Sequence, residues 1–136
     1  MPVHRTPLTP RFGELDPYNH VNHAAYVAYF EAARCVALDA IGMSLSDLSD
    51  TGFQIVVTSL EVKFREPATA RDCLIVETWI DEMKRVSSVW KQQILRDSDN
   101  RLLVSAELTL GVCDAYGKPT RPPADLNASL AQLMQE

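Results

Sequence analysis

Most of the chain after residue 53 alternates between apolar and polar residues with a period of two, which is typical of β-strands with one buried face. The clearest run covers residues 102–113, where apolar residues occupy every second position from Leu102 to Val112. Polar turns separate this run from its neighbours. The expected strands are 7–13, 53–65, 74–82, 86–96 and 102–113. We expect the last four to pair as an antiparallel meander.

Residues 23–41 have a different pattern, because apolar side chains occupy most of the circumference of the predicted helix. Asn22 is a good N-cap, and Gly42 suits the left-handed residue that ends a helix. The few charges in this segment, at roughly helical spacing on one side, are Glu31, Arg34 and Asp39. A helix that is apolar nearly all round is expected to be surrounded by protein.

These elements predict one α+β domain over residues 1–136, because no internal repeat or low-complexity linker divides the chain. An antiparallel sheet of about five strands that wraps around the helix is the simplest way to bury both. A short helix with Leu126, Leu130 and Leu133 at helical spacing closes the chain. The strands are long for so small a domain, so we expect dimerisation to cover their edges.

Composition and charge argue against several classes of function. The chain is 46% hydrophobic and 23% charged, with a net charge of −5, which argues against general nucleic-acid or anionic-membrane binding. Charges interrupt the most apolar stretch, 24–41, which favours a buried helix over a membrane span. Three widely spaced cysteines predict neither a zinc site nor a disulfide framework. With no signal-peptide pattern at the N-terminus, these features favour a reducing cytoplasm.

The turn before the long helix, residues 16–23, concentrates polar and ionisable side chains. The first N–H groups of a helix have no partner within it, and they can stabilise an oxyanion. Asp16, at the start of the turn, is a candidate to attack a carbonyl or to take a proton from water. Residue types alone leave two simpler readings open: Asp16 caps the turn, or His20 and His23 are hydrogen-bonded structural residues.

The run Asp16-x-x-x-His20-Val21-Asn22-x-x-x-Tyr26, followed by Tyr29-Phe30-Glu31-Ala32-Ala33-Arg34, resembles the signature of the 4-hydroxybenzoyl-CoA thioesterase family. That family includes Tol-Pal-associated acyl-CoA thioesterases. The resemblance continues through 60–68, Asp72 and Leu74, and covers about residues 9–120. It implies a hot-dog fold, assembly as a dimer or a dimer of dimers, and an active site at the dimer interface.

The resemblance also implies roles for individual residues. The family's catalytic aspartate falls on Asp16, and its oxyanion donor, a backbone N–H seven positions on, falls on His23. The His23 side chain takes part as well in some relatives. His20 and Asn22 match polar positions of the motif that order the turn. Tyr26 either lines the acyl pocket or belongs to the core.

Three further positions are candidates for substrate contacts. Glu31 matches a position that often holds a carboxylate, although a surface or interface pair with Arg34 would explain it equally well. Lys84 and Arg85 align with a basic run that contacts nucleotide phosphates, and cations at a turn suit a phosphorylated carrier. Here Val86 replaces the third basic residue, and an ordinary solvated hairpin is the alternative.

The expected activity is hydrolysis of acyl-CoA thioesters to a carboxylate and free coenzyme A, which is part of the substrate. We expect no separate cofactor and no metal, because no nucleophile elbow, dinucleotide, phosphate-loop or metal-binding motif occurs. Lys63 and Arg65 are expected on the outer strand surface. Two alternatives stay open: a hot-dog hydratase or dehydratase acting on acyl thioesters, and a non-catalytic acyl-CoA binding protein.

Overall fold

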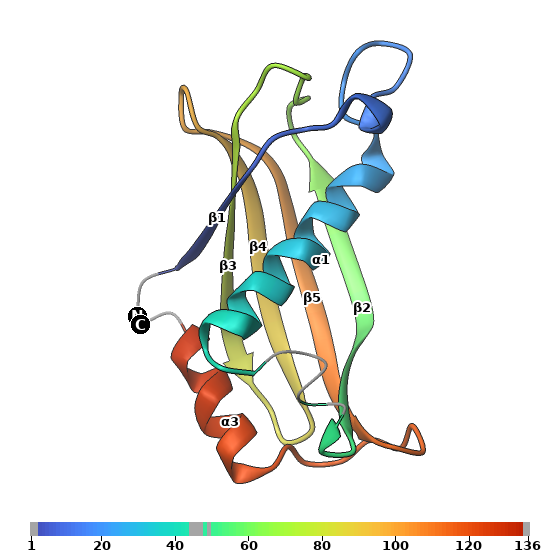
Figure 1. The fold of residues 1–136 in the computed structure, drawn as a ribbon, viewed down its shortest axis with the longest axis vertical. Helices are drawn as coiled ribbons and strands as arrows, with labels where there is room; N and C mark the ends of the chain where they lie inside the picture. Colours follow the sequence, from blue (N-terminus) through green and yellow to red (C-terminus); the bar gives the residue numbers. More distant parts are fainter. Residues whose placement is uncertain (1–2, 44–47, 49, 135–136) are drawn as a thin grey trace.

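The computed structural model describes residues 3–43, 48 and 50–134. Its main elements follow the predicted order, and each strand after the first agrees with its predicted bounds to within one residue at both ends. The helices and strands are β1 (His4–Leu8), α1 (His23–Ala40), β2 (Phe53–Phe64), β3 (Leu74–Met83), β4 (Ser87–Arg96), β5 (Arg101–Asp114) and α3 (Ala124–Leu130). One curved five-stranded sheet lies along the long helix α1 (Figure 1).

The strand order is β1-β3-β4-β5-β2, and every neighbouring pair is antiparallel. The predicted meander is therefore correct for β3, β4 and β5 but wrong for β2, which pairs with β5 rather than β3. The chain leaves β2 at one edge and crosses over the end of β4 and β5 through residues 65–73 before it enters β3 (Figure 1). This crossing leaves β2 as an edge strand.

The core lies between α1 and the concave face of the sheet. In β5, paired with β2 and β4, the helix-facing residues Val104, Ala106, Leu108, Leu110 and Val112 are all buried, as their alternation predicts. The largest fully buried side chains of the core include Trp90, Phe30, Leu74, Ile80 and Ile94. The predicted terminal helix packs on this core, since its three leucines at 126, 130 and 133 are all buried.

The first strand differs from the prediction, which placed it at 7–13. Strand β1 ends at Leu8, and a 3₁₀ turn occupies Phe12–Glu14. The Arg11 N–H donates to Glu14 Oε1 at 2.8 Å, and this side-chain contact gives the backbone a local alternative to the sheet. Pro7 is tolerated because β1 is the other edge strand.

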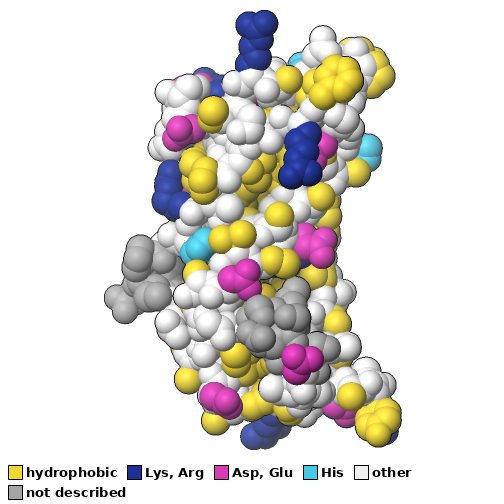
Figure 2. All heavy atoms as spheres, viewed as in Figure 1, with side chains coloured by type: hydrophobic (Ala, Val, Ile, Leu, Met, Phe, Trp, Pro, Cys, Tyr) yellow, Lys and Arg dark blue, Asp and Glu magenta, His cyan; other side chains and the backbone are white. Residues whose placement is uncertain are grey.

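Helix α1 begins after Asn22, as predicted, and Gly42 adopts a φ of +79° just beyond its end. The prediction that protein surrounds this helix is wrong for the single chain. One side packs on the sheet, whereas Val27 and Val36 on the other side are exposed. Hydrophobic side chains are visible among polar ones along the diagonal course of the helix (Figure 2). The described helices include none that could cross a bilayer.

Candidate active site

The turn that precedes α1 is built around Asp16. The backbone of Asp16 donates to the His20 carbonyl at 2.7 Å, and its carboxylate Oδ1 accepts the N–H groups of Tyr18 at 2.8 Å and His20 at 3.1 Å. Asn19 closes the turn with a φ of +61°, a left-handed conformation that asparagine tolerates better than most residues. Asp16 therefore does cap the turn, but with one carboxylate oxygen, so that the second oxygen is not used in this way.

Asn22 fastens the turn to the helix. Its Oδ1 accepts the Ala25 N–H at 2.8 Å, and its Nδ2 donates to the Glu14 carbonyl at 3.0 Å. This asparagine is the N-cap, and both ends of its amide are occupied, so the structure gives it an ordering role. The N–H of His23, the first residue of α1, has no acceptor among the described residues. This amide is one of the unpaired donors expected at a helix start.

Four of the predicted residues line one cavity of about 410 Å³: Asp16, His20, His23 and Tyr26. The Tyr26 ring is buried, and its hydroxyl accepts the Ala68 N–H at 3.0 Å. Burial raises the pKa of Tyr26, and the nearby carboxylates of Asp16 and Asp72 add to this effect, although the hydrogen bond from Ala68 opposes it. Tyr26 is thus both a core residue and a wall of the cavity.

The remaining wall comes from residues to which the sequence analysis gave no role in the site. Phe64, Arg65, Glu66 and Pro67, at the end of β2 and the start of the 65–73 crossing, line the cavity with Val21. The Phe64 ring lies 5.8 Å from the Tyr26 ring and is 53% exposed. An apolar ring, a carboxylate and the first residue of α1, whose N–H is unpaired among the described residues, therefore share one opening. Only knowledge of the crossing would have predicted that this segment reaches the turn.

A hydrogen-bonded pair of ionisable side chains, Tyr29 and Glu14, supports the turn from the β1 side. Tyr29 donates its hydroxyl to Glu14 Oε1 at 2.6 Å. Burial, followed by this hydrogen bond, raises the pKa of Tyr29 far above its ordinary value. Burial alone would raise the pKa of Glu14, but the Tyr29 and Arg11 contacts outweigh it and the pKa is lowered. The contact with Tyr29 thus holds Glu14, whose backbone carbonyl accepts from Asn22 Nδ2.

Glu31 does not belong to this cavity in the single chain. It lies on the exposed side of α1, one turn beyond Val27. Arg34 instead points toward the sheet, where its Nη1 donates to Gln92 Oε1 at 2.9 Å. Burial lowers the pKa of Arg34, and the nearby Glu31 carboxylate opposes this effect. Within one chain the electrostatic Glu31–Arg34 pair therefore fits better than a site carboxylate, although the hydrogen bond of Arg34 goes to Gln92.

The structure does not bring Lys84 and Arg85 to Asp16 within one chain. They lie in the β3–β4 turn, at the opposite end of the sheet (Figure 1). Strand β3 separates the two ends by roughly 30 Å, since a strand rises about 3.4 Å per residue. There they line a separate pocket of about 380 Å³, which Arg121 and Asn127 complete. Arg121, unsuspected from the sequence, makes this a cluster of three cations.

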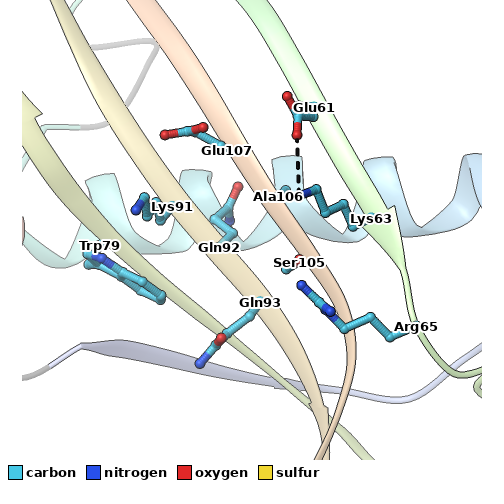
Figure 3. Close-up of a pocket in the computed structure, with 10 residues that line it drawn as sticks. All are labelled: Glu61, Lys63, Arg65, Trp79, Lys91, Gln92, Gln93, Ser105, Ala106 and Glu107. Atoms are coloured by element: carbon cyan, nitrogen blue, oxygen red, sulfur yellow. Dashed lines mark ion pairs between the residues drawn. The ribbon is translucent and has the colours of Figure 1, made fainter.

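A further groove lies on the outer face of the sheet, away from α1 (Figure 3). Lys63 points outward here and pairs with Glu61 at 3.8 Å, so the prediction for Lys63 is confirmed. Arg65 extends from the end of β2 toward β5 in this view, and it also lines the Asp16 cavity. The prediction for Arg65 is therefore incomplete. No group of three or more potential metal-ligating side chains occurs within the described ranges.

A helix set against a curved antiparallel sheet, with its polar entry turn opening into a cavity, defines the hot-dog class of the thioesterases. Residues 10–130 match the model of the thioesterase-like superfamily, and the chain belongs to this family. The fold and family predicted from the motif are thereby confirmed.

Individual relatives agree with this assignment. The chain is 31% identical over 129 residues to the acyl-CoA thioester hydrolase YbgC of Escherichia coli, covering 94% of this chain and 96% of the relative. It is 27% identical to the chloroplastic acyl-acyl carrier protein thioesterase ATL2 of Arabidopsis thaliana, covering 92% of this chain and 66% of the relative. The DHNA-CoA thioesterase of Staphylococcus aureus, at 24% identity, has the same fold with a TM-score of 0.88, and the match covers 96% and 89% of the two chains.

Proposed function

We propose that this protein hydrolyses acyl-CoA thioesters and that Asp16 and the His23 backbone N–H carry the reaction. One observation supports this most strongly: Asp16 and the N-terminal residue of α1 open into the same cavity. The names of the bacterial relatives support coenzyme A as the carrier, and the name of a plant relative makes acyl-carrier protein the alternative. The net charge of −5 favours coenzyme A, because acyl-carrier proteins are themselves usually acidic.

The chemistry needs an oxygen nucleophile and a donor for the developing oxyanion. The Asp16 Oδ1 is held by two amides, which leaves Oδ2 to attack the thioester carbonyl or to take a proton from an attacking water. The His23 N–H, which has no acceptor among the described residues, would stabilise the carbonyl oxygen as it becomes negative. The C–S bond then breaks, the sulfur leaves as the coenzyme A thiol after it gains a proton, and the acyl group leaves as a carboxylate once water has added.

The acyl group would occupy the apolar surface that α1 leaves uncovered on β2. Val57, Leu60 and Phe64 share the helix-facing side of the sheet, since they pair with buried residues of β5, yet each is at least two-fifths exposed. This surface continues from the cavity wall at Phe64. Exposed apolar surface of this extent beside a cavity favours a bound apolar group or a second protein chain.

A second copy of the chain is the occupant that best explains edge strand β2. Its 12 residues pair with β5 on one side only, and an edge of this length is a template for another strand. We propose a two-fold dimer in which the two β2 strands pair antiparallel. A dimer of dimers is the alternative assembly.

This dimer would restore the predicted role of the basic cluster. Antiparallel pairing of β2 places the β3–β4 turn of the partner at the same end of the double sheet as the Asp16 cavity. Lys84, Arg85 and Arg121 would then face an incoming coenzyme A, whose phosphates suit three cations. Glu31, on the exposed face of α1, would lie toward the partner. We also propose a cytoplasmic location, which the free thiols of Cys35, Cys73 and Cys113 support.

A thiol-release screen over short, long and aromatic acyl-CoA substrates tests this function. Release of free coenzyme A with at least one of them is the expected result. A parallel incubation with crotonyl-CoA, followed by the loss of enoyl absorbance, tests the hydratase alternative. Retention of acyl-CoA without thiol release would instead indicate a binding protein. Either of these two outcomes, without hydrolysis of any substrate, would contradict the proposal.

A further inference from the structure

The crossing between β2 and β3, residues 65–73, is fixed to the sheet at both ends. The N–H groups of Arg65 and Glu66 both donate to the Leu103 carbonyl, at 2.8 and 3.1 Å. At the other end the Asp97 N–H donates to the Cys73 carbonyl at 2.9 Å. These contacts hold the ends of the crossing, but they leave its central part to be positioned by other groups.

The central part supports the candidate active site directly. The Val21 N–H donates to the Ala68 carbonyl at 2.9 Å, and the Ala68 N–H donates to the Tyr26 hydroxyl at 3.0 Å. His20 forms an isolated antiparallel bridge with Thr69, and its N–H is also one of the two donors that hold Asp16 Oδ1. A displacement of residues 68–69 would therefore move the amide that orients the Asp16 carboxylate.

The Arg96 side chain holds the crossing on both sides of residues 68–69, which contact the turn. Arg96, at the end of β4, donates from Nη2 to the Pro67 carbonyl at 3.2 Å, and its Nε lies 3.4 Å from Asp72 Oδ2. Its Nη1 donates to Asp99 Oδ2 at 2.9 Å in the β4–β5 turn. Asp72 Oδ2 in turn accepts the Thr69 N–H at 2.9 Å. The planar guanidinium thus joins three acceptors, an arrangement that the single ammonium of lysine does not reproduce.

The location of Arg96 separates it from the reacting groups. Its side chain is 21% exposed, and it does not line the Asp16 cavity. It touches the crossing at residues 67 and 72, on both sides of the two residues that contact the turn. Through the crossing, these contacts connect Arg96 to the turn that carries Asp16.

We infer that Arg96 is a positioning residue for the hydrolysis, which holds residues 67–72 against the turn so that Asp16 keeps its orientation. This inference rests on the proposed function. Because a displacement of about 1 Å can cost up to about 100-fold in rate, loss of this support is expected to reduce kcat more than KM. The acyl group would contact Phe64, which pairs with Val104 in the sheet and is not among the polar partners of Arg96.

The test compares Arg96→Met, Arg96→Lys and a control, Arg5→Met, in the full-length protein. Arg5 pairs with Glu77 across β1 and β3, so its loss removes an arginine–carboxylate pair far from the crossing. We expect Arg96→Met to lower kcat about tenfold or more with KM within about twofold of wild type. Arg96→Lys should recover part of the loss, and the control should keep wild-type kcat.

Amide hydrogen exchange provides a readout that does not depend on turnover. In Arg96→Met, the amides of Val21 and Ala68 should exchange faster than in wild type, whereas amides at the centre of β3 and β4 should not change. Unchanged exchange at both amides, a kcat within twofold of wild type, or an equal loss in Arg5→Met would overturn the inference. If the wild type hydrolyses no acyl-CoA, the proposed function fails, and the exchange rates alone decide whether Arg96 positions the turn.

Discussion

Replacement of Gln92 by leucine tests how the central helix is held on the sheet. Gln92 lies in β4 beneath α1 and is 1% exposed. Its Nε2 donates to the Phe30 carbonyl and to Thr78 Oγ1, both at 2.9 Å, and its Oε1 accepts from Arg34 at the same distance. Leucine has a similar volume but makes none of these hydrogen bonds, so Arg34, Thr78 and the Phe30 carbonyl each lose one hydrogen bond at once.

The expected loss of stability follows from these contacts. A hydrogen bond contributes about 1 kcal/mol net, and a buried group left unpaired costs roughly 1–3 kcal/mol. Arg34 is only partly buried and can reach water, and the Phe30 carbonyl keeps its helical hydrogen bond within α1, so the largest penalty belongs to the buried Thr78 hydroxyl. Together these terms predict a decrease of about 2–4 kcal/mol in the free energy of unfolding. For a chain of this length that corresponds to a Tm lower by roughly 10 °C.

Urea denaturation measures this decrease. All variants are compared at one protein concentration, so that self-association affects each of them equally. Gln93→Leu is the matched control, because Gln93 is the next residue, faces the opposite side of the sheet and makes one part-buried bond, to Glu77. We expect the control to lose less than about 1 kcal/mol. A loss below about 0.5 kcal/mol in Gln92→Leu, or equal losses in the two variants, would refute the role of this network.

Three further predictions concern the turn, pH and assembly. Asn22→Ala should lower the free energy of unfolding by about 1 kcal/mol, and it should also slow thiol release, because the cap and the link to Glu14 are both lost; unchanged turnover would argue against an ordered turn. Burial raises the pKa of Tyr29 in the folded protein, so the contribution of Tyr29 to the free energy of unfolding should be fully present below about pH 10 and should decrease at higher pH. Urea midpoints between pH 9 and 11 should fall less steeply in Tyr29→Phe. Leu60→Lys on β2 should have the mass of one chain in analytical ultracentrifugation, and a wild type of that same mass would disprove the dimer.

Periodicity predicted most of the fold because each strand from β3 to β5 buries one face and exposes the other. The helix was equally readable, since Asn22 and Gly42 mark its ends with side-chain and backbone chemistry. Alternation identifies the buried face of a strand, however, and not its neighbour. A nine-residue connection such as 65–73 suits either an adjacent strand or a crossing, which is why β2 was placed beside β3.

The same limit explains what was missed in the site. Asp16, His20, His23 and Tyr26 are close in sequence, so the motif could predict that they meet. Phe64 to Pro67 and Arg96 reach the turn only through the crossing, and no local pattern signals that contact. Lys84 and Arg85 were placed near the reaction by resemblance alone, and in the single chain they lie at the other end of the sheet.

The most direct measurement of the central claim is thiol release from acyl-CoA by Asp16→Asn beside the wild type. Asparagine retains an oxygen that can accept the Tyr18 and His20 amides, so the circular dichroism spectrum and Tm should stay close to those of wild type. It lacks the negative oxygen, and turnover should fall by at least about 100-fold. Turnover within a few-fold of wild type, in a folded variant, would contradict a catalytic role for this carboxylate.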